Sequence, residues 1–267
     1  MAWYRFARPG WTPEQKNPFE RDGKTTDWAA FLYHNQGFGY SHTYPGAKIH
    51  TLVVRPEGDP EFIRLRDYVQ YENSFCRTVI LSAPGELLEP AGEALEGRWD
   101  CRERLVRRSD PKYVVHSTTH AAWHSIRTMG VLLSAVQQRR QGLEVKEVGF
   151  LPMLEPPEYS RYVMLDIPEG CGEMTVCSRQ TGRICRNPQE PYRPEVRLYF
   201  NAHRMIRNGL AVRDGLHPIK VKRELELGPY FLMALTAQDV DPNRQDWTPA
   251  SFARAADLEF RRRMGEN

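Results

Sequence analysis

A histidine and two hydroxyl side chains stand together at the end of an apolar run in the middle of the chain. Val114 and Val115 are followed by His116, Ser117 and Thr118. An imidazole beside hydroxyls can clamp a ligand by hydrogen bonds, act as a catalytic base or bind a metal, and it can also be a structural residue. We take all three side chains as candidate binding residues. Thr118 has a second interpretation, as the N-cap of the helix that follows.

Metal ligation is not expected from the spacing of the cysteines and histidines. Cys171, Cys177 and Cys185 lie close together but form no CxxC pair, and zinc ligands usually come in tighter pairs. His120 and His124 stand four residues apart on an expected helix, yet no third ligand has a matching spacing. The sequence therefore predicts no metal site. Five cysteines, an odd number, favour reduced thiols over a disulfide framework.

Composition indicates a globular protein of the cytoplasm or nucleus. Of the 267 residues, 40% are hydrophobic and 27% are charged, with a formal net charge of +3. The first twenty residues contain no apolar run of the kind that a secretory signal needs. No stretch approaches the roughly 18 apolar residues of a membrane span. We therefore expect no membrane association.

Positive charge is concentrated in two segments, 101–140 and 196–223. The first contains eight Lys and Arg against two acidic residues, and the second contains seven against one. Arginine can grip phosphate through two parallel hydrogen bonds, so both segments are candidate polyanion contacts. A solvated charged face is the alternative interpretation.

Hydrophobic patterning places these residues on strands and helices. We expect residues 1–27 to form an extended arm, a helix to begin at Asp59-Pro60, and residues 83–100 to form loop and short helix. A last helix should begin at Thr248-Pro249 and dock through Phe252, Ala255, Ala256 and Phe260. The expected strands cover 48–55, 78–82, 113–116, 162–167, 173–177, 196–200 and 230–237.

Two segments share one plan of strand, polar turn, short helix and glycine. The first is 114–130, where Ala122, Ile126 and Met129 share a helix face and Gly130 can take a left-handed cap. The second is 196–210, where Ala202, Met205 and Ile206 play the same part before Gly209.

The first of these segments, VVHSTTHAAWHSIRTMGVL, resembles the part of RNA 2′-phosphotransferases in which a strand carries a His-Gly-Thr signature. His116 and Thr118 keep the outer signature positions, while Ser117 replaces the glycine. RYVMLDIPEG, TVCSRQTGR and LYFNAHRMIRNGLAVRDGLHPI continue in the family's order. The resemblance covers roughly residues 109–240, and residues 135–160 look like an insertion.

The resemblance implies an α+β fold of the ADP-ribosyltransferase type, a split β-sheet whose cleft holds NAD. It implies a two-step reaction, in which an RNA 2′-phosphate displaces nicotinamide from the ribose and a neighbouring hydroxyl then frees the RNA. Trp123, Tyr199 and His203 become candidate cleft residues beside His116. Core packing is the favoured interpretation for Trp123, and Tyr199 could equally be core. Arg179 and Arg183 compete for the family's phosphate arginine, with surface charge as the alternative for both.

The chain departs from the family in its first part. Family members begin with a helical lobe carrying an Arg-His-x-x-Arg motif that grips the 2′-phosphate, and no Arg-His dipeptide occurs here. We divide the chain into an N-terminal α/β region of uncertain fold at 1–108, a transferase-like domain at 109–240 and a C-terminal helix at 241–267. The expected function is an NAD-dependent transferase acting on RNA or another phosphate-bearing acceptor. The alternatives are an ADP-ribosyltransferase that modifies nucleic acid or protein and omits the second step, and a non-catalytic nucleotide- or RNA-binding protein.

Overall fold

The computed structural model describes residues 3–8, 10–12, 27–35, 39–44, 47–97, 99–145, 157–168 and 172–266, with backbone alone at 39–44, 47–50 and 157. The chain forms two compact units. Unit 1 holds most of the chain before Arg104, together with Arg213–His217. Unit 2 holds most of the remainder, including the C-terminal helix. The described helices include none that is both long and apolar enough to span a bilayer.

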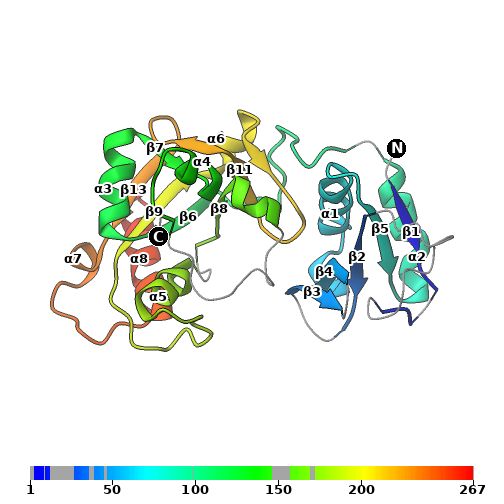
Figure 1. The fold of residues 1–267 in the computed structure, drawn as a ribbon, viewed down its shortest axis with the longest axis horizontal. Helices are drawn as coiled ribbons and strands as arrows, with labels where there is room; N and C mark the ends of the chain where they lie inside the picture. Colours follow the sequence, from blue (N-terminus) through cyan, green and yellow to red (C-terminus); the bar gives the residue numbers. More distant parts are fainter. Residues whose placement is uncertain are drawn as a thin grey trace. The chain divides into compact units, whose positions relative to one another are not determined.

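Unit 1 is built on a five-stranded sheet in the order β1-β5-β2-β4-β3 (Figure 1). β1 (Tyr4–Phe6), β5 (Thr78–Ser82), β2 (Trp28–Tyr33) and β4 (Ala47–Val54) run parallel, and β3 (Gly39–Tyr44) runs antiparallel to β4. The short 3-10 helix η1 (Pro56–Gly58) and the helices α1 (Ile63–Asn73) and α2 (Gly85–Glu96) complete the unit. An apolar run such as TVILS, buried in the middle of β5, is typical of a parallel strand covered on both faces.

Two expectations for unit 1 were wrong in detail. The described part of the N-terminal arm is packed, because β1 joins the sheet and Trp11 is buried. The helix expected at Asp59-Pro60 begins at Ile63, after Phe62 in a left-handed conformation (φ 53°). Asp59 still receives the backbone N–H groups of Arg64 and Leu65, at 2.9 and 3.0 Å. The carboxylate therefore caps the helix from a position farther upstream than a normal N-cap.

The described part of unit 2 contains three antiparallel sheets, all of which contribute side chains to one hydrophobic cluster. The sheet β13-β9-β6 consists of β13 (Phe231–Leu235), β9 (Val196–Asn201) and β6 (Tyr113–Thr118). The sheet β10-β11-β8 consists of β10 (Ala211–Val212), β11 (Ile219–Lys222) and β8 (Tyr162–Leu165). β12 (Glu224–Glu226) pairs with β7 (Val131–Leu133). The helical segments are α3 (His120–Met129), α4 (Ala135–Arg140), η2 (Pro157–Arg161), α5 (Gly172–Thr181), α6 (Ala202–Arg207), α7 (Ala237–Val240) and α8 (Pro249–Arg263).

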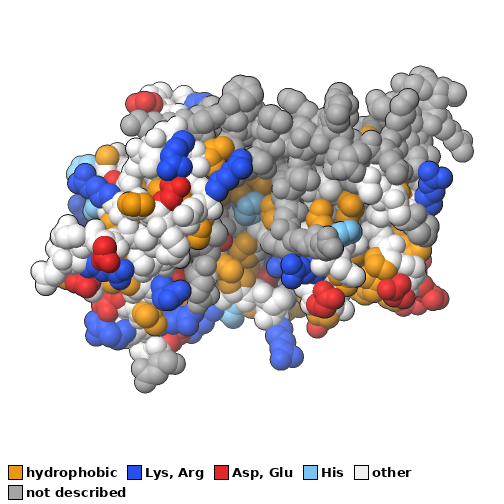
Figure 2. All heavy atoms as spheres, turned by 90° about the horizontal axis from the view of Figure 1, so that it is seen from below, with side chains coloured by type: hydrophobic (Ala, Val, Ile, Leu, Met, Phe, Trp, Pro, Cys, Tyr) orange, Lys and Arg blue, Asp and Glu red, His pale blue; other side chains and the backbone are white. Residues whose placement is uncertain are grey.

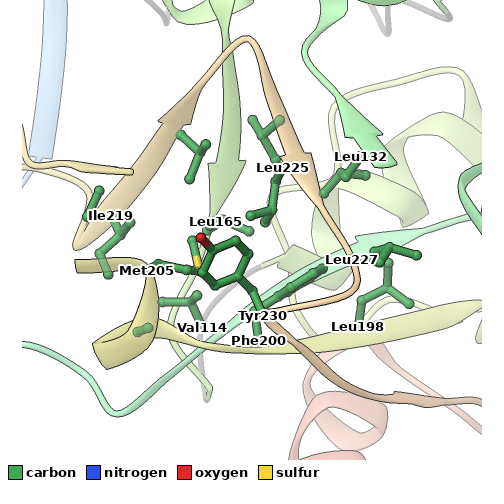
Figure 3. Close-up of a cluster of buried hydrophobic side chains, with 14 of the residues drawn as sticks. Val114, Leu132, Leu165, Leu198, Phe200, Met205, Ile219, Leu225, Leu227 and Tyr230 are labelled. Atoms are coloured by element: carbon green, nitrogen blue, oxygen red, sulfur yellow. The ribbon is translucent and has the colours of Figure 1, made fainter. Parts of the chain in front are cut away.

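The two faces of β6 pack into different cores because successive side chains of a strand point to opposite sides. Val114 joins the cluster drawn in Figure 3, with Leu165 of β8, Phe200 of β9 and Ile219 of β11. Tyr113 and Val115 face the other way, into a cluster with residues of α5 and α8. The side chains that follow Val115 along β6 therefore alternate between the same two faces.

The expected docking of the C-terminal helix is confirmed. Phe252, Ala256 and Phe260 of α8 are buried, and Ala255 packs partly buried beside them. The helix is thus part of unit 2 rather than a separate segment. The left-handed cap at Gly130 is also confirmed, with φ 70°.

The strand expected at 173–177 was wrong, because these residues belong to helix α5. Its buried residues include Glu173, Val176 and Cys177, which have the i, i+3, i+4 spacing of one helix face. The β-branched pair Thr175-Val176 had suggested a strand, but the burial of this face against β6 and α8 decides the local structure.

Candidate functional site

His116 lies on the face of β6 that also carries Val114 and Thr118. Its imidazole is half-buried, and Nδ1 stands 3.1 Å from the carbonyl oxygen of Met164 in β8. A carbonyl can only accept, so Nδ1 carries the proton and the neutral ring keeps Nε2 as an acceptor. The fold thus fixes the ring orientation through the contact between β6 and β8.

The imidazole is held in its neutral form. Burial lowers the pKa of His116 to about 4, against the opposing effect of the Met164 carbonyl, and the positive charge of Arg179 lowers it further. At neutral pH the ring is therefore an uncharged acceptor beside a permanent cation. Such a pair suits a ligand that combines a hydroxyl group with a phosphate.

We expect His116 to titrate near pH 4 in proton NMR spectra of the imidazoles. Because its pKa in the folded protein lies below the ordinary value of 6.5, the unfolded chain binds more protons between pH 6.5 and 4. The free energy of unfolding should therefore fall as pH decreases through this window, with a contribution of up to about 3 kcal/mol from His116.

The control for this titration is a second histidine. His116→Gln should remove this part of the pH dependence, whereas His124→Gln, at an exposed position on α3, should keep it. A phosphate compound bound at Arg179 should move the midpoint upward, since it offsets the guanidinium charge. A midpoint near 6.5 would contradict the buried, neutral assignment.

Arg179 comes from α5, which packs on the opposite side of β6. β6 is the outer strand of its three-stranded sheet, and on its outer side Val115 forms an antiparallel bridge with Asp166. The Arg179 side chain is exposed overall, while nearby protein removes enough water from the guanidinium to lower its pKa. The cation therefore stays available to an incoming anion while its charge acts on His116.

Thr118 and Ser117 point to opposite faces of β6. Thr118 is buried on the face of His116, and it is not the helix cap: the side chain of Thr119 accepts the Ala122 N–H at 3.1 Å, which corrects that alternative for Thr118. Ser117 points to the opposite face and donates to Glu173 at the start of α5. A Cβ on Gly172 would stand 3.0 Å from the Ser117 Oγ, so glycine permits this close approach.

Ser117 belongs to a buried ionic network that the sequence did not reveal. Arg197 is fully buried and donates to both oxygens of Asp257, at 3.0 and 3.2 Å, and to Glu173 at 3.3 Å. The hydroxyl of Tyr199 donates to Asp257 at 2.8 Å, and that of Tyr192 donates to Glu173. This network joins β9, α5 and α8.

Burial by itself lowers the pKa of Arg197, but attraction to Asp257 and Glu173 outweighs it and the pKa is raised. One sequence signal could have located this network. Arg197 and Tyr199 alternate in an otherwise apolar strand, and Asp257 interrupts the apolar face of the last helix.

The remaining candidate cleft residues have other contacts in the structure. The Tyr199 ring is fully buried and stacks on Phe260, with centroids 4.1 Å apart. Trp123 packs on Phe231 against the core, which favours the core interpretation for both aromatic residues.

His203 lies toward the other end of the strand pair. It follows Asn201, which pairs with Tyr113, the first residue of β6. His116 is three residues farther along β6 than Tyr113, which corresponds to about 10 Å along the strand.

Arg183 is engaged with a carboxylate. Its two terminal nitrogens donate to the two oxygens of Glu190, both at 3.1 Å, and its side chain is 63% exposed. Of the two competing arginines, Arg179 is the one whose charge acts on His116.

The second basic segment, 196–223, does not form one cationic surface. Arg197 is neutralised in its network, Arg213 is buried in unit 1, and the ammonium of Lys220 is buried 3.9 Å from the ring of Tyr159. On the face shown in Figure 2, Lys and Arg side chains are scattered among acidic and hydrophobic ones. The exposed cations of this segment are Arg204, Arg207, Lys222 and Arg223.

Unit 1 contains a cavity of about 760 Å³ with Gln70, Trp99 and Cys101 among its lining residues. Arg102 of the basic segment 101–140 lines it, but none of the candidate residues from His116 to His203 does. Its lining combines the cation Arg102 with polar side chains such as Gln70 and Asn73, but it contains no histidine. We therefore place the candidate site in unit 2.

Comparisons with known proteins identify no relative. No family model matches the chain, and neither a curated protein nor a solved structure is similar to it. The function must be argued from the residues themselves.

Proposed function

We propose that unit 2 is an NAD-dependent transferase that acts on RNA or another phosphate-bearing acceptor, at a site built around His116 and Arg179. The observation that carries the proposal is a neutral imidazole acceptor, oriented on β6 by the Met164 carbonyl, on which the positive charge of Arg179 acts. NAD and a nucleic acid end both present ribose hydroxyls beside phosphates, which are the partners that these two groups bind.

Each residue has a distinct part in this proposal. His116 would accept a hydrogen bond from a ribose hydroxyl through Nε2, and Arg179 would stabilise phosphate charge. Thr118 shares the His116 face, while Ser117 would hold the start of α5 through Glu173. The antiparallel sheets β13-β9-β6 and β10-β11-β8, packed on one core, support an ADP-ribosyltransferase-like split sheet as the fold of unit 2.

The reaction would begin with attack of an acceptor oxygen on the anomeric carbon of the nicotinamide ribose, and nicotinamide would leave with the bonding electrons. The second step of the 2′-phosphotransferases needs more phosphate donors, and the chain lacks the Arg-His-x-x-Arg motif. Loss of one preorganised donor can slow such a step about 10²–10³-fold. An ADP-ribosylated acceptor should therefore accumulate, which makes a transferase without the second step the second candidate.

The test is release of nicotinamide from NAD in the presence of a 2′-phosphorylated RNA oligomer, with mass spectrometry of the oligomer. His116→Ala should weaken NAD binding by roughly 1–3 kcal/mol in calorimetry, because it removes a buried hydrogen-bond partner. His124→Ala, on the exposed side of α3, serves as the matched control and should bind NAD like the unchanged protein.

The oligomer mass distinguishes the candidates. A gain of one ADP-ribosyl group supports the one-step transferase, and loss of the phosphate supports the two-step reaction. NAD binding without nicotinamide release from any acceptor would indicate a non-catalytic nucleotide- or RNA-binding protein. Absence of NAD binding, or unchanged affinity in His116→Ala, would contradict the proposed site.

A further inference from the structure

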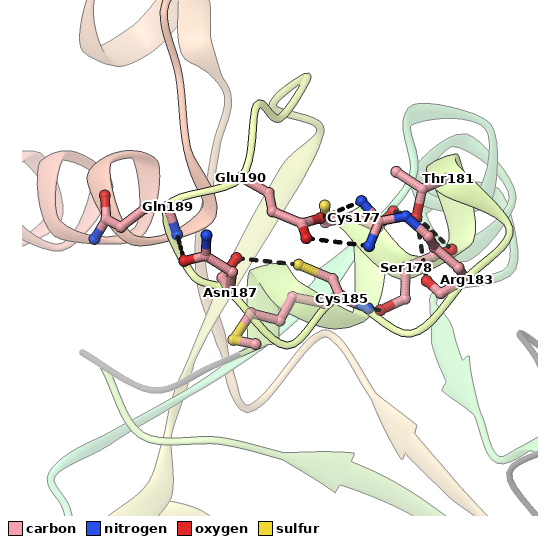
Figure 4. A network of polar contacts seen from close by, with 9 residues as sticks. Cys177, Ser178, Thr181, Arg183, Cys185, Asn187, Gln189 and Glu190 are labelled. Carbon is pink, nitrogen blue, oxygen red and sulfur yellow. Dashed lines mark hydrogen bonds and ion pairs between the residues drawn. The ribbon is translucent and has the colours of Figure 1, made fainter.

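Two buried cysteines and a glutamate meet beside the carboxyl end of α5 (Figure 4). Cys177 lies on the helix, while Cys185 and Glu190 lie on the loop that follows it. Their sulfur and carboxylate oxygen atoms all stand within 4.8 Å of one another. Both cysteines are free and buried, and Glu190 is half-buried toward solvent.

Hydrogen bonds fix the loop against the helix. The backbone N–H of Cys185 donates to the Ser178 hydroxyl at 2.8 Å, and that hydroxyl donates to the Met174 carbonyl at 2.7 Å. The Thr181 hydroxyl donates to the Arg183 carbonyl at 3.2 Å. The thiol of Cys185 donates to the Asn187 carbonyl at 3.3 Å and lies within 4.8 Å of the Cys177 sulfur. Side chains held in this way lose little freedom when they bind a ligand.

We propose that Cys177, Cys185 and Glu190 form a binding site for a thiophilic divalent cation of the Zn²⁺ type, with the fourth position open to water. Zinc binds thiolates and carboxylates in tetrahedral geometry, with ligand atoms about 3.8 Å apart or slightly less. The three side chains would therefore have to draw together by about 1 Å or less. The sequence predicted no zinc site because no CxxC pair occurs, but the fold brings Glu190 to the two cysteines.

Arg183 completes the charge balance. Two thiolates and a carboxylate around a divalent cation leave one excess negative charge, which the Arg183 guanidinium can neutralise. Each oxygen of Glu190 has two acceptor sites, so the carboxylate can bind the cation and keep its bonds to Arg183. Carboxylate ligands of metals are commonly supported by such an outer partner.

The bound cation would tie the loop to the end of α5. Arg179 stands two residues after Cys177 on that helix, so the site would restrain the segment that carries the proposed phosphate arginine. Cys171, which the sequence placed near these cysteines, lies outside the described residues. The site therefore rests on three ligands and does not depend on the function proposed above.

The experiment is a titration of the reduced, metal-free full-length protein with Co²⁺ under anaerobic conditions, followed by absorption spectroscopy and displacement with Zn²⁺. We expect one equivalent of Co²⁺ to bind with thiolate-to-cobalt charge-transfer absorption and the visible bands of a tetrahedral ion. Glu190→Gln should weaken binding by at least the roughly 10–100-fold typical of an outer partner, and Cys185→Ser should remove the charge-transfer band or weaken binding still more.

Cys76→Ser is the matched control, because Cys76 is an exposed free thiol of unit 1 and should leave the titration unchanged. Circular dichroism checks that each variant folds, and Glu190→Gln keeps the test valid if a buried cysteine cannot be replaced. A reduced protein without thiolate–cobalt absorption would overturn the proposal, as would a spectrum that survives Cys185→Ser. So would a Cys177–Cys185 disulfide that forms in air while the reduced protein binds no cation.

Discussion

Replacing Arg197 with methionine should lower the free energy of unfolding by about 3–5 kcal/mol, as is typical when one partner of a buried ion pair is removed. Asp257 and Glu173 would remain buried without the guanidinium that now contacts both. Chemical denaturation monitored by circular dichroism measures the difference. The large effect reflects the position of Arg197 where β9, α5 and α8 meet.

The control is Arg204→Met, at an exposed position on α6, which should change the free energy of unfolding by no more than about 0.5 kcal/mol. A double variant that also carries Asp257→Leu should recover part of the loss, because it removes one uncompensated carboxylate. Equal stability of Arg197→Met and Arg204→Met would show that the network contributes little.

The second large effect is expected at Arg179, within the proposed transferase. Arg179→Gln should slow nicotinamide release about 10²-fold, because the guanidinium would no longer hold the acceptor phosphate in position to attack the anomeric carbon. Single-turnover measurements with saturating NAD separate this loss from weaker binding. Circular dichroism should show an unchanged fold, since the Arg179 side chain is exposed.

Two other arginines test the specificity of that result. Arg186→Gln, at an exposed position of the loop that follows α5, should leave the rate unchanged. Arg183→Gln removes the partner of Glu190 and should affect cobalt binding more than nicotinamide release. A larger rate loss in Arg183→Gln than in Arg179→Gln would transfer the phosphate role to Arg183.

Local patterns in the sequence determined many elements of this protein. The apolar run 78–82 is β5, the residues from Tyr113 form β6, and the apolar face of the last helix docks as expected. Gly130 ends α3 in the left-handed conformation that its position indicated. These features depend on side-chain alternation, helix periodicity and backbone freedom within one segment, so neighbouring residues suffice to predict them.

Other features depend on contacts between distant segments. Residues 173–177 include the β-branched pair Thr175-Val176, which is compatible with a strand. They form a helix because Glu173 and Val176 are buried against segments from other parts of the chain. The described part of the N-terminal arm is packed because β1 pairs with β5, which lies more than seventy residues farther along the chain.

The candidate sites show the same division. The order of residues in the chain singled out His116, but it could not choose between Arg179 and Arg183, because only the packing of α5 against β6 sets which charge acts on the imidazole. In the sequence, Arg197 is one of the cations of a basic segment. The structure buries it against Asp257 and Glu173, which are 60 and 24 residues away in the chain. A sequence records the charge of a side chain, and the tertiary structure decides whether that charge meets a partner or solvent.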